Sequence, residues 1–277
     1  MKTTSLKLIA VLLLLGMGSQ AQAFPQTFDG ATNNPANGKS LAAKVKFEIS
    51  GSNLQVTLTN TSTQGVHDAS DLLTAVFFDI TTPSNASFVV NATHGSAVLG
   101  AGSSIINTGF CNASPCTSTN NVGGEWQYKE GLPSASFTIN NQTYNRGTRG
   151  FSSTGLGIFG SPNLNGLNLQ NPAPLNGAEF GIVSGSGLDS NANSSVTTQA
   201  LIQKQVVFTV GLPTNFDPSQ QISNVFFQWG TALYGTAGGE PGGPGGPPAG
   251  NVPEPASLAL FASGLLGLAL RRGARRT

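Results

Sequence analysis

The sequence predicts an all-β protein with a single β-sandwich-like domain over residues 24–234 and Gly- and Asn-rich loops. Charged residues make up only 9% of the 277 residues. Gly, Asn, Ser and Thr, which favour turns and strands over long helices, fill the surface positions instead. Sixteen Phe supply material for a core. Roughly nine short strand candidates are separated by turn signals, a pattern typical of a sandwich.

The first two strand candidates form a hairpin. In residues 44–50, Val45, Phe47 and Ile49 alternate with polar residues, which predicts a strand with one wet face. A turn signal at 51–53 follows, and residues 54–58 continue the same alternation. We therefore expect the two segments to pair with each other.

Further along the chain, residues 72–80 form a nearly continuous apolar run, which predicts a central strand buried on both faces. Residues 125–129 and 134–140 are expected to pair with each other. Residues 151–174 predict a long structured loop, and residues 201–205 fit either a short helical turn or the start of a strand. The remaining strand candidates are residues 87–91, 96–99, 179–184, 206–211 and 225–229.

Residues 1–23 predict a secretory signal peptide. Lys2 and Lys7 form a basic start, residues 8–17 form an apolar core, and Ala21 and Ala23 complete a small-x-small cleavage site. We expect cleavage after Ala23. The chain is therefore predicted to be exported, with the signal peptidase and the export machinery as partners.

The C-terminal residues 252–277 combine three features in a fixed order. Pro253, Glu254 and Pro255 come first, and the prolines prevent a helix from extending backwards. The uncharged run 256–270 predicts a short transmembrane helix of roughly 22 Å, against about 30 Å for the hydrocarbon core of a bilayer. A basic cluster then favours the cytoplasmic side of the membrane: Arg271, Arg272, Arg275 and Arg276. This length suits transient retention in the membrane better than permanent anchoring. The Gly- and Pro-rich residues 235–251 predict an exposed linker before the tail.

This order of motif, apolar span and basic cluster resembles the PEP-CTERM sorting signal. That signal is found on exported proteins of Gram-negative bacteria that also make extracellular polysaccharide. The resemblance implies processing by exosortase, a membrane-embedded cysteine protease. It also implies a precursor held in the inner membrane, followed by a protein at the cell surface or outside the cell. Residues 71–80, 123–128 and 155–160 resemble a recurrent group of exosortase-dependent surface proteins, which implies no catalytic residues.

Two cysteines, Cys111 and Cys116, enclose a short Asn- and Pro-containing loop. In an exported protein this spacing predicts a local disulfide. A metal or redox pair is the alternative, but no His and no third Cys is close in the sequence.

The formal net charge of +1 conceals an acidic body. Six of the thirteen Lys and Arg lie in the two terminal signals, which leaves seven, and eleven of the twelve acids lie outside them. The body therefore carries a charge of about −4. Because phosphate recognition requires clustered Lys and Arg, nucleic acid is excluded as an expected partner.

No catalytic motif stands out. The nucleophile elbow G-x-S-x-G is absent, and nothing selects a pair from the carboxylates Glu125, Glu130, Asp189 and Asp217. His67, Asp68, Asp71 and Asp79 suggest a calcium site, although solvated loop acids are the default interpretation. We therefore predict no catalytic residues, no metal and no cofactor.

Three aromatic residues, Trp126, Tyr128 and Trp229, are candidates for binding sugars by stacking, although aromatic residues on strands more often belong to the core. The leading hypothesis is a non-enzymatic surface or biofilm-matrix protein associated with exopolysaccharide. A carbohydrate-binding or adhesin module is the second hypothesis, and a secreted hydrolase is the third.

Overall fold

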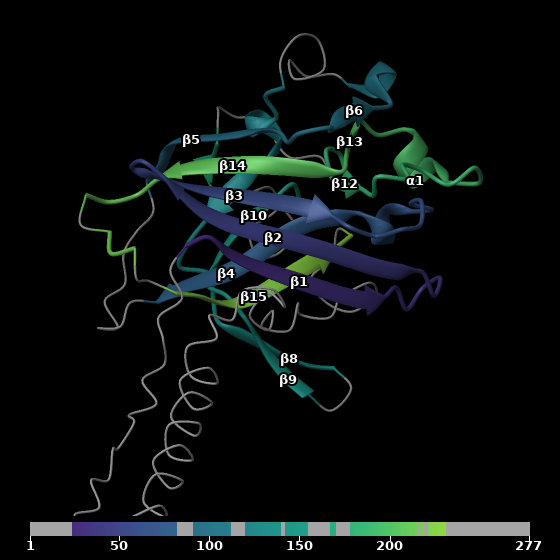
Figure 1. Ribbon diagram of the computed structural model, residues 1–277. Coiled ribbons are helices and arrows are strands. Elements are labelled where there is room, and N and C mark those ends of the chain that lie inside the picture. The colour runs from purple at the N-terminus through teal and green to yellow at the C-terminus, as the bar shows by residue number, and fades with distance from the viewer. Residues whose placement is uncertain are drawn as a thin grey trace, which may run out of the picture.

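The computed structural model describes residues 24–81, 91–111, 120–139, 142–154, 167–169, 178–214, 216–218 and 221–230. In these ranges the chain forms two large β-sheets packed on each other and one small two-stranded sheet (Figure 1). The prediction of an all-β fold is confirmed. The strand candidate at 87–90 and most of the predicted loop 151–174 lie outside the described residues.

One sheet has five strands, and every neighbouring pair in it is antiparallel. Its order is β1 (Gln26–Asn33), β2 (Ser40–Ser50), β3 (Asn53–Asn60), β14 (Gln205–Gly211) and β5 (Asn91–Leu99). Along β2, β3 and β14, buried side chains of the inner face alternate with half-buried or exposed ones, as expected for a sheet with one solvated face.

The second sheet has eight strands. Along its main path lie β11 (Leu167–Asn168), β7 (Gln127–Lys129), β10 (Arg149–Ser152), β4 (Leu73–Thr81), β12 (Ile182–Val183), β13 (Leu201–Gln203) and β6 (Ser104–Ile106). The eighth strand, β15 (Gln221–Trp229), pairs with β4.

β8 (Ala135–Ile139) and β9 (Gln142–Arg146) form the small sheet, which projects below the two large ones in Figure 1. The short helices are η1 (Ala69–Asp71), η2 (Thr108–Phe110), η4 (Gly123–Glu125) and α1 (Ser194–Thr197).

The N-terminal hairpin is confirmed. β2 and β3 pair in register from Ala43 opposite Asn60 to Ser50 opposite Asn53. Gly51 makes the turn with a φ of +59°, a conformation that glycine adopts without steric cost. β4 is confirmed as a strand buried on both faces, since it is buried from residue 73 to residue 78 and lies between β10 and β15.

Residues 201–205 belong to strands and not to a helical turn. Residues 201–203 form β13 in the eight-stranded sheet, and Gln205 begins β14 in the five-stranded sheet. Lys204 stands between them with a φ of +84°, which turns the chain from one sheet into the other. One continuous segment of the chain therefore serves both sheets.

The expected pairing of residues 125–129 with residues 134–140 is wrong. β7 pairs with β10 and β11, whereas β8 pairs with β9, the next segment of the chain. The local hairpin takes the nearer partner, and Tyr128 instead lies opposite Phe151 of β10. Residues 151–152, expected in a loop, end β10, and Glu125 lies in η4 and not in a strand. β1 has a single large apolar residue, Phe28, and was not predicted.

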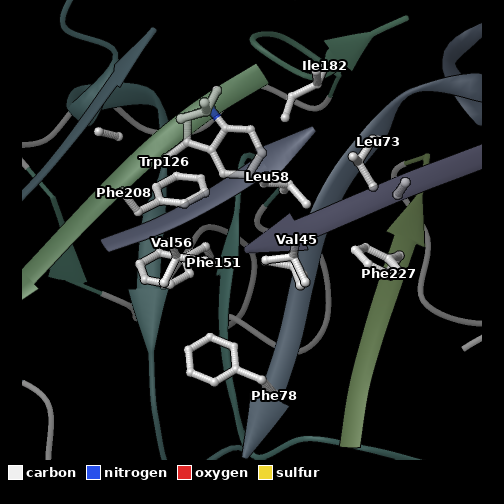
Figure 2. Close-up of a cluster of buried hydrophobic side chains, with 14 of the residues drawn as sticks. Val45, Val56, Leu58, Leu73, Phe78, Trp126, Phe151, Ile182, Phe208 and Phe227 are labelled. Atoms are coloured by element: carbon white, nitrogen blue, oxygen red, sulfur yellow. The ribbon is translucent and has the colours of Figure 1, made fainter. Parts of the chain in front are cut away.

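Aromatic rings fill the space between the two large sheets (Figure 2). The ring of Phe151 in β10 stacks on that of Phe208 in β14, with centroids 4.4 Å apart and planes 9° apart. Trp126 contacts the same Phe208 ring at 5.0 Å, and Phe47 contacts Phe78 at 4.9 Å. These contacts join residues of opposite sheets, so the main core is the interface between the sheets.

We expect Phe151→Ala to lower the free energy of unfolding by about 3–5 kcal/mol, because it removes a fully buried ring and leaves a cavity between the sheets. Urea denaturation followed by tryptophan fluorescence measures this loss. Phe110→Ala is the control, since Phe110 is 49% exposed and its removal should change stability by less than about 0.5 kcal/mol. Equal effects of the two substitutions would contradict the assignment of the core.

Candidate functional site

Asp71, which was weighed as a calcium ligand against the default of a solvated loop acid, is buried and organises a group of loops at one end of the sandwich. Asp71 is 1% exposed, and its Oδ1 accepts hydrogen bonds from Nδ2 of Asn34 (2.6 Å) and Nδ2 of Asn37 (3.0 Å). Its Oδ2 accepts one from the backbone N–H of His67 at 2.9 Å. Asp68 caps η1 by accepting from the backbone N–H of Ser70. Asp71 therefore fastens the β1–β2 turn to the loop before β4.

The same end of the molecule contains an ion pair between Lys39 and Asp189. The ammonium of Lys39 also donates to the carbonyl oxygen of Gly65 at 2.6 Å. The backbone N–H of Asn193 donates to the carbonyl oxygen of His67 at 2.8 Å. Asp189, one of the carboxylates considered for catalysis, thus joins the loop before α1 to the rest of this end.

Asp71 lies two residues before β4, and Asp79 lies near the far end of that strand, six residues after its start at Leu73, which corresponds to roughly 20 Å along an extended strand. Asp79 accepts hydrogen bonds from the backbone N–H and the hydroxyl of Thr148 (2.8 and 2.7 Å) and from Nδ2 of Asn224 (2.8 Å). Asp68, Asp71 and Asp79 therefore do not share one site. The described ranges contain no group of three or more His, Cys, Asp or Glu side chains arranged to hold a metal ion.

The three aromatic candidates for sugar binding lie in the core. Trp126 is 0% exposed, Trp229 2% and Tyr128 3%, and Trp126 and Tyr128 pack on Phe208 and Phe151, respectively. Their burial agrees with the interpretation that aromatic residues on strands form core, and it does not support the candidate role in stacking on sugars. Because these side chains are almost fully buried, their ring faces are not open to a sugar.

Two acids that are distant in the sequence, Glu125 and Glu179, are brought near each other by the fold. Glu125 in η4 is 4% exposed, and burial raises its pKa to about 7, with a further contribution from the negative charge of Glu179. Glu179 lies in the turn before β12, 54 residues away in the sequence, so no local motif could have indicated the pair. A carboxyl group with such a pKa exchanges a proton near neutral pH.

Glu130 belongs to a different group. Its Oε2 accepts a hydrogen bond from the hydroxyl of Tyr128 at 3.3 Å and lies 3.8 Å from Nε of Arg149. Burial, followed by the charge of Glu130, raises the pKa of Tyr128 above its usual range. Asp217 is exposed and lies after β14, next to the half-buried Phe216. The four carboxylates considered for catalysis are therefore distributed over separate surroundings.

The terminal signals lie outside the described residues, including the cleavage site at Ala23, the motif Pro253-Glu254-Pro255 and the arginines from 271 to 276. Cys111 is half-buried, packs against the core and is not a free thiol. Its predicted partner Cys116 is not described, so the bridge between them stays a prediction. Among the described helices none is long and apolar enough to cross a membrane, and the run 256–270 is not among them.

Comparison with known proteins identifies one segment. The PEP-CTERM protein-sorting motif matches residues 251–276. The chain therefore carries this sorting motif, which indicates an exported protein of the cell envelope or surface that exosortase processes. No curated protein and no solved structure shows significant similarity to the chain.

We expect Asp71→Ala to lower the free energy of unfolding by about 2–4 kcal/mol, because the donors of Asn34, Asn37 and His67 lose a buried charged acceptor. Chemical denaturation measures the loss. Asp29→Ala is the matched control, since the Asp29 side chain is 66% exposed and its ion pair with Lys44 contributes little. A loss for Asp71→Ala no larger than that of the control would show that Asp71 does not fasten the loops.

Glu125 should make stability depend on pH. Its pKa in the folded state, about 7, lies above the ordinary value of 4.5, so the folded state binds the proton more tightly than the unfolded state. Its contribution is therefore present below about pH 4.5 and is lost as the pH rises towards 7. Glu125→Gln should remove this decline, on the order of 1–2 kcal/mol after allowance for partial solvation of the carboxyl. Unfolding of both forms at a series of pH values measures it, and parallel curves would contradict the assignment.

Proposed function

We propose that this chain, which ends in a PEP-CTERM sorting motif, is an exosortase-processed component of the cell surface or extracellular matrix with a structural role and no catalytic activity. The observation that carries the proposal is the match of the sorting motif at residues 251–276. In the proposed pathway, the export machinery delivers the body, the apolar tail holds the precursor in the inner membrane, and exosortase then releases or transfers it. Contact with exopolysaccharide outside the cell is part of the same proposal.

The start of the folded body supports the proposed site of signal cleavage. Phe24 follows Ala23 directly, and its ring packs against Phe216 with centroids 6.1 Å apart. β1 begins two residues later at Gln26. A mature chain beginning at Phe24 would therefore keep every packed residue of the body, whereas later cleavage would remove part of the fold.

The use of the acids supports a structural role. Asp71, Asp79 and Asp189 each bind a neighbouring loop, through hydrogen bonds or an ion pair. Acids with such partners hold loops in place, and general acid–base catalysis instead requires a positioned carboxyl within reach of a substrate. The buried aromatic rings remove the argument that favoured a sugar-stacking module, so we propose no second function.

Deleting residues 253–277 should shift the protein from a membrane-retained precursor to a product free in the medium. The reason is that the deletion removes both the apolar span and the arginines that stop transfer. Fractionation of producing cells and medium, followed by immunoblotting, measures the distribution. The matched control leaves the Pro-Glu-Pro motif intact and replaces the arginines of the tail by Ala: Arg271, Arg272, Arg275 and Arg276. It distinguishes loss of retention in the membrane from loss of recognition by exosortase. An unchanged distribution after the deletion would overturn the sorting proposal.

The intact mass of the mature surface protein tests the same proposal independently. We expect the N-terminus at Phe24, a C-terminus near Pro253 to Pro255, and the mass of any group that exosortase attaches. A mature protein that still contains residues 256–277 would contradict processing at the motif.

A further inference from the structure

One long edge of the five-stranded sheet pairs with no further strand among the described residues. β1 pairs with β2 along its whole length, from Gln26 opposite Phe47 to Asn33 opposite Ser40, and with no other strand. In Figure 1, β1 lies at the border of the front sheet with β2 on one side only. An edge strand of this kind presents a row of backbone donors and acceptors to any chain that can pair with it.

The register shows which groups point outward. The backbone N–H of Asn34 donates to the carbonyl oxygen of Lys39 at 2.8 Å, which makes these two residues a hydrogen-bonded pair. In an antiparallel ladder such pairs alternate with non-bonded ones, so Gln26, Phe28, Gly30 and Thr32 bond to β2. The residues between them direct both backbone groups away from β2: Thr27, Asp29, Ala31 and Asn33.

These outward groups have no hydrogen-bond partner in the part of the chain that the structure describes. The opposite edge of the same sheet differs. There the N–H of Leu99 donates to the carbonyl oxygen of Asn120 at 2.7 Å, and the N–H of Val122 donates to that of Ala97 at 2.8 Å, so residues 97–99 of β5 are covered. In addition to its ladder with β2, β1 contacts β15 at its start, where Gln26 Oε1 accepts from the N–H of Ile222 at 2.9 Å. Among the described residues, the β5 edge is therefore closed at residues 97–99, and the β1 edge is open from residue 27 to residue 33.

We propose that the open edge pairs with β1 of a second copy of this chain. The two strands run antiparallel about a twofold axis at Gly30, and the two five-stranded sheets become one continuous sheet of ten strands. In this register Thr27 pairs with Asn33 of the second copy, and Asp29 pairs with its Ala31. Each such pair exchanges two backbone hydrogen bonds, so all of the outward groups from residue 27 to residue 33 are satisfied.

The side chains fit this register. Gly30 opposes itself at the axis, where a larger side chain would meet its own copy. Asp29 opposes the small Ala31, so no like charges face each other, and its carboxylate already lies 3.3 Å from the ammonium of Lys44. A twofold interface requires one surface that is complementary to itself, and this edge meets that requirement. This is why a second copy, and not a foreign strand, is the proposed partner.

The pairing goes beyond the proposed function, and it concerns only the folded body. A surface component that associates through its sheet edge can join neighbouring molecules without a ligand. Substitutions in β1 leave the sorting tail untouched, and deletion of the tail leaves β1 untouched. Failure of this proposal and failure of the sorting proposal are therefore distinguishable.

Ala31→Pro tests the edge without breaking the ladder to β2, because residue 31 directs its N–H outward. Analytical ultracentrifugation of the full-length chain in a mild non-ionic detergent should show a monomer–dimer equilibrium. The substitution should weaken the dimer at least tenfold, whereas Ala31→Ser, which keeps the N–H, should not. Tryptophan fluorescence from the buried Trp126 and Trp229 reports that each variant is folded. If Ala31→Pro does not fold, Thr27→Pro removes another outward N–H and replaces it in the test.

A chain that stays monomeric up to roughly 100 μM would overturn the proposal, as would a dimer that both proline variants leave intact. A spin label at Asn33→Cys tests the register itself. Six residues of ladder separate the two labels in the dimer, which predicts a distance of roughly 20 Å by pulsed electron paramagnetic resonance. A separation beyond about twice that value would place the contact elsewhere and overturn the assignment of the edge.

Discussion

The stacking of Phe151 on Phe208 is the contact on which the rest of the structure depends. One ring comes from the eight-stranded sheet and the other from the five-stranded sheet, with centroids 4.4 Å apart. Trp126 packs against Phe208 and Tyr128 against Phe151, so the position of β7 follows from this pair. Two packed sheets need side chains that interdigitate across about 10 Å. The aromatic rings of this core span that distance.

The sequence was informative wherever apolar residues alternated with polar ones over a whole strand. β2, β3 and β14 show that pattern, and β4 shows the continuous run of a strand buried on both faces. β10 could not be identified, because four residues including Gly150 carry no period. Its place is set by partners far away in the sequence. The sorting tail was predictable because its physical properties are local, whereas the pair Glu125 and Glu179 exists only in the folded chain.

The low charge of the chain explains how its acids are used. With 9% charged residues, the surface consists mainly of neutral hydroxyl and amide groups, and the described acids at positions 71, 79 and 189 are engaged with loops. Neutral side chains bind weakly to one another in water, whereas a buried carboxylate that accepts several hydrogen bonds is strongly held. The loops at the ends of the sandwich therefore depend on single acids, and the surface carries few charges that keep copies apart.

The same reasoning connects β1 to assembly. Charged residues are the usual means of preventing edge-to-edge pairing, and β1 has one, Asp29, whose charge Lys44 offsets. Its centre consists of Gly30 and Ala31, which is why it shows no hydrophobic pattern in the sequence. Those two small residues are also what allows another backbone to approach closely. The small residues that leave this strand without a hydrophobic pattern thus also make its edge suitable for pairing, while residues 97–99 of β5 are covered by residues 120–122.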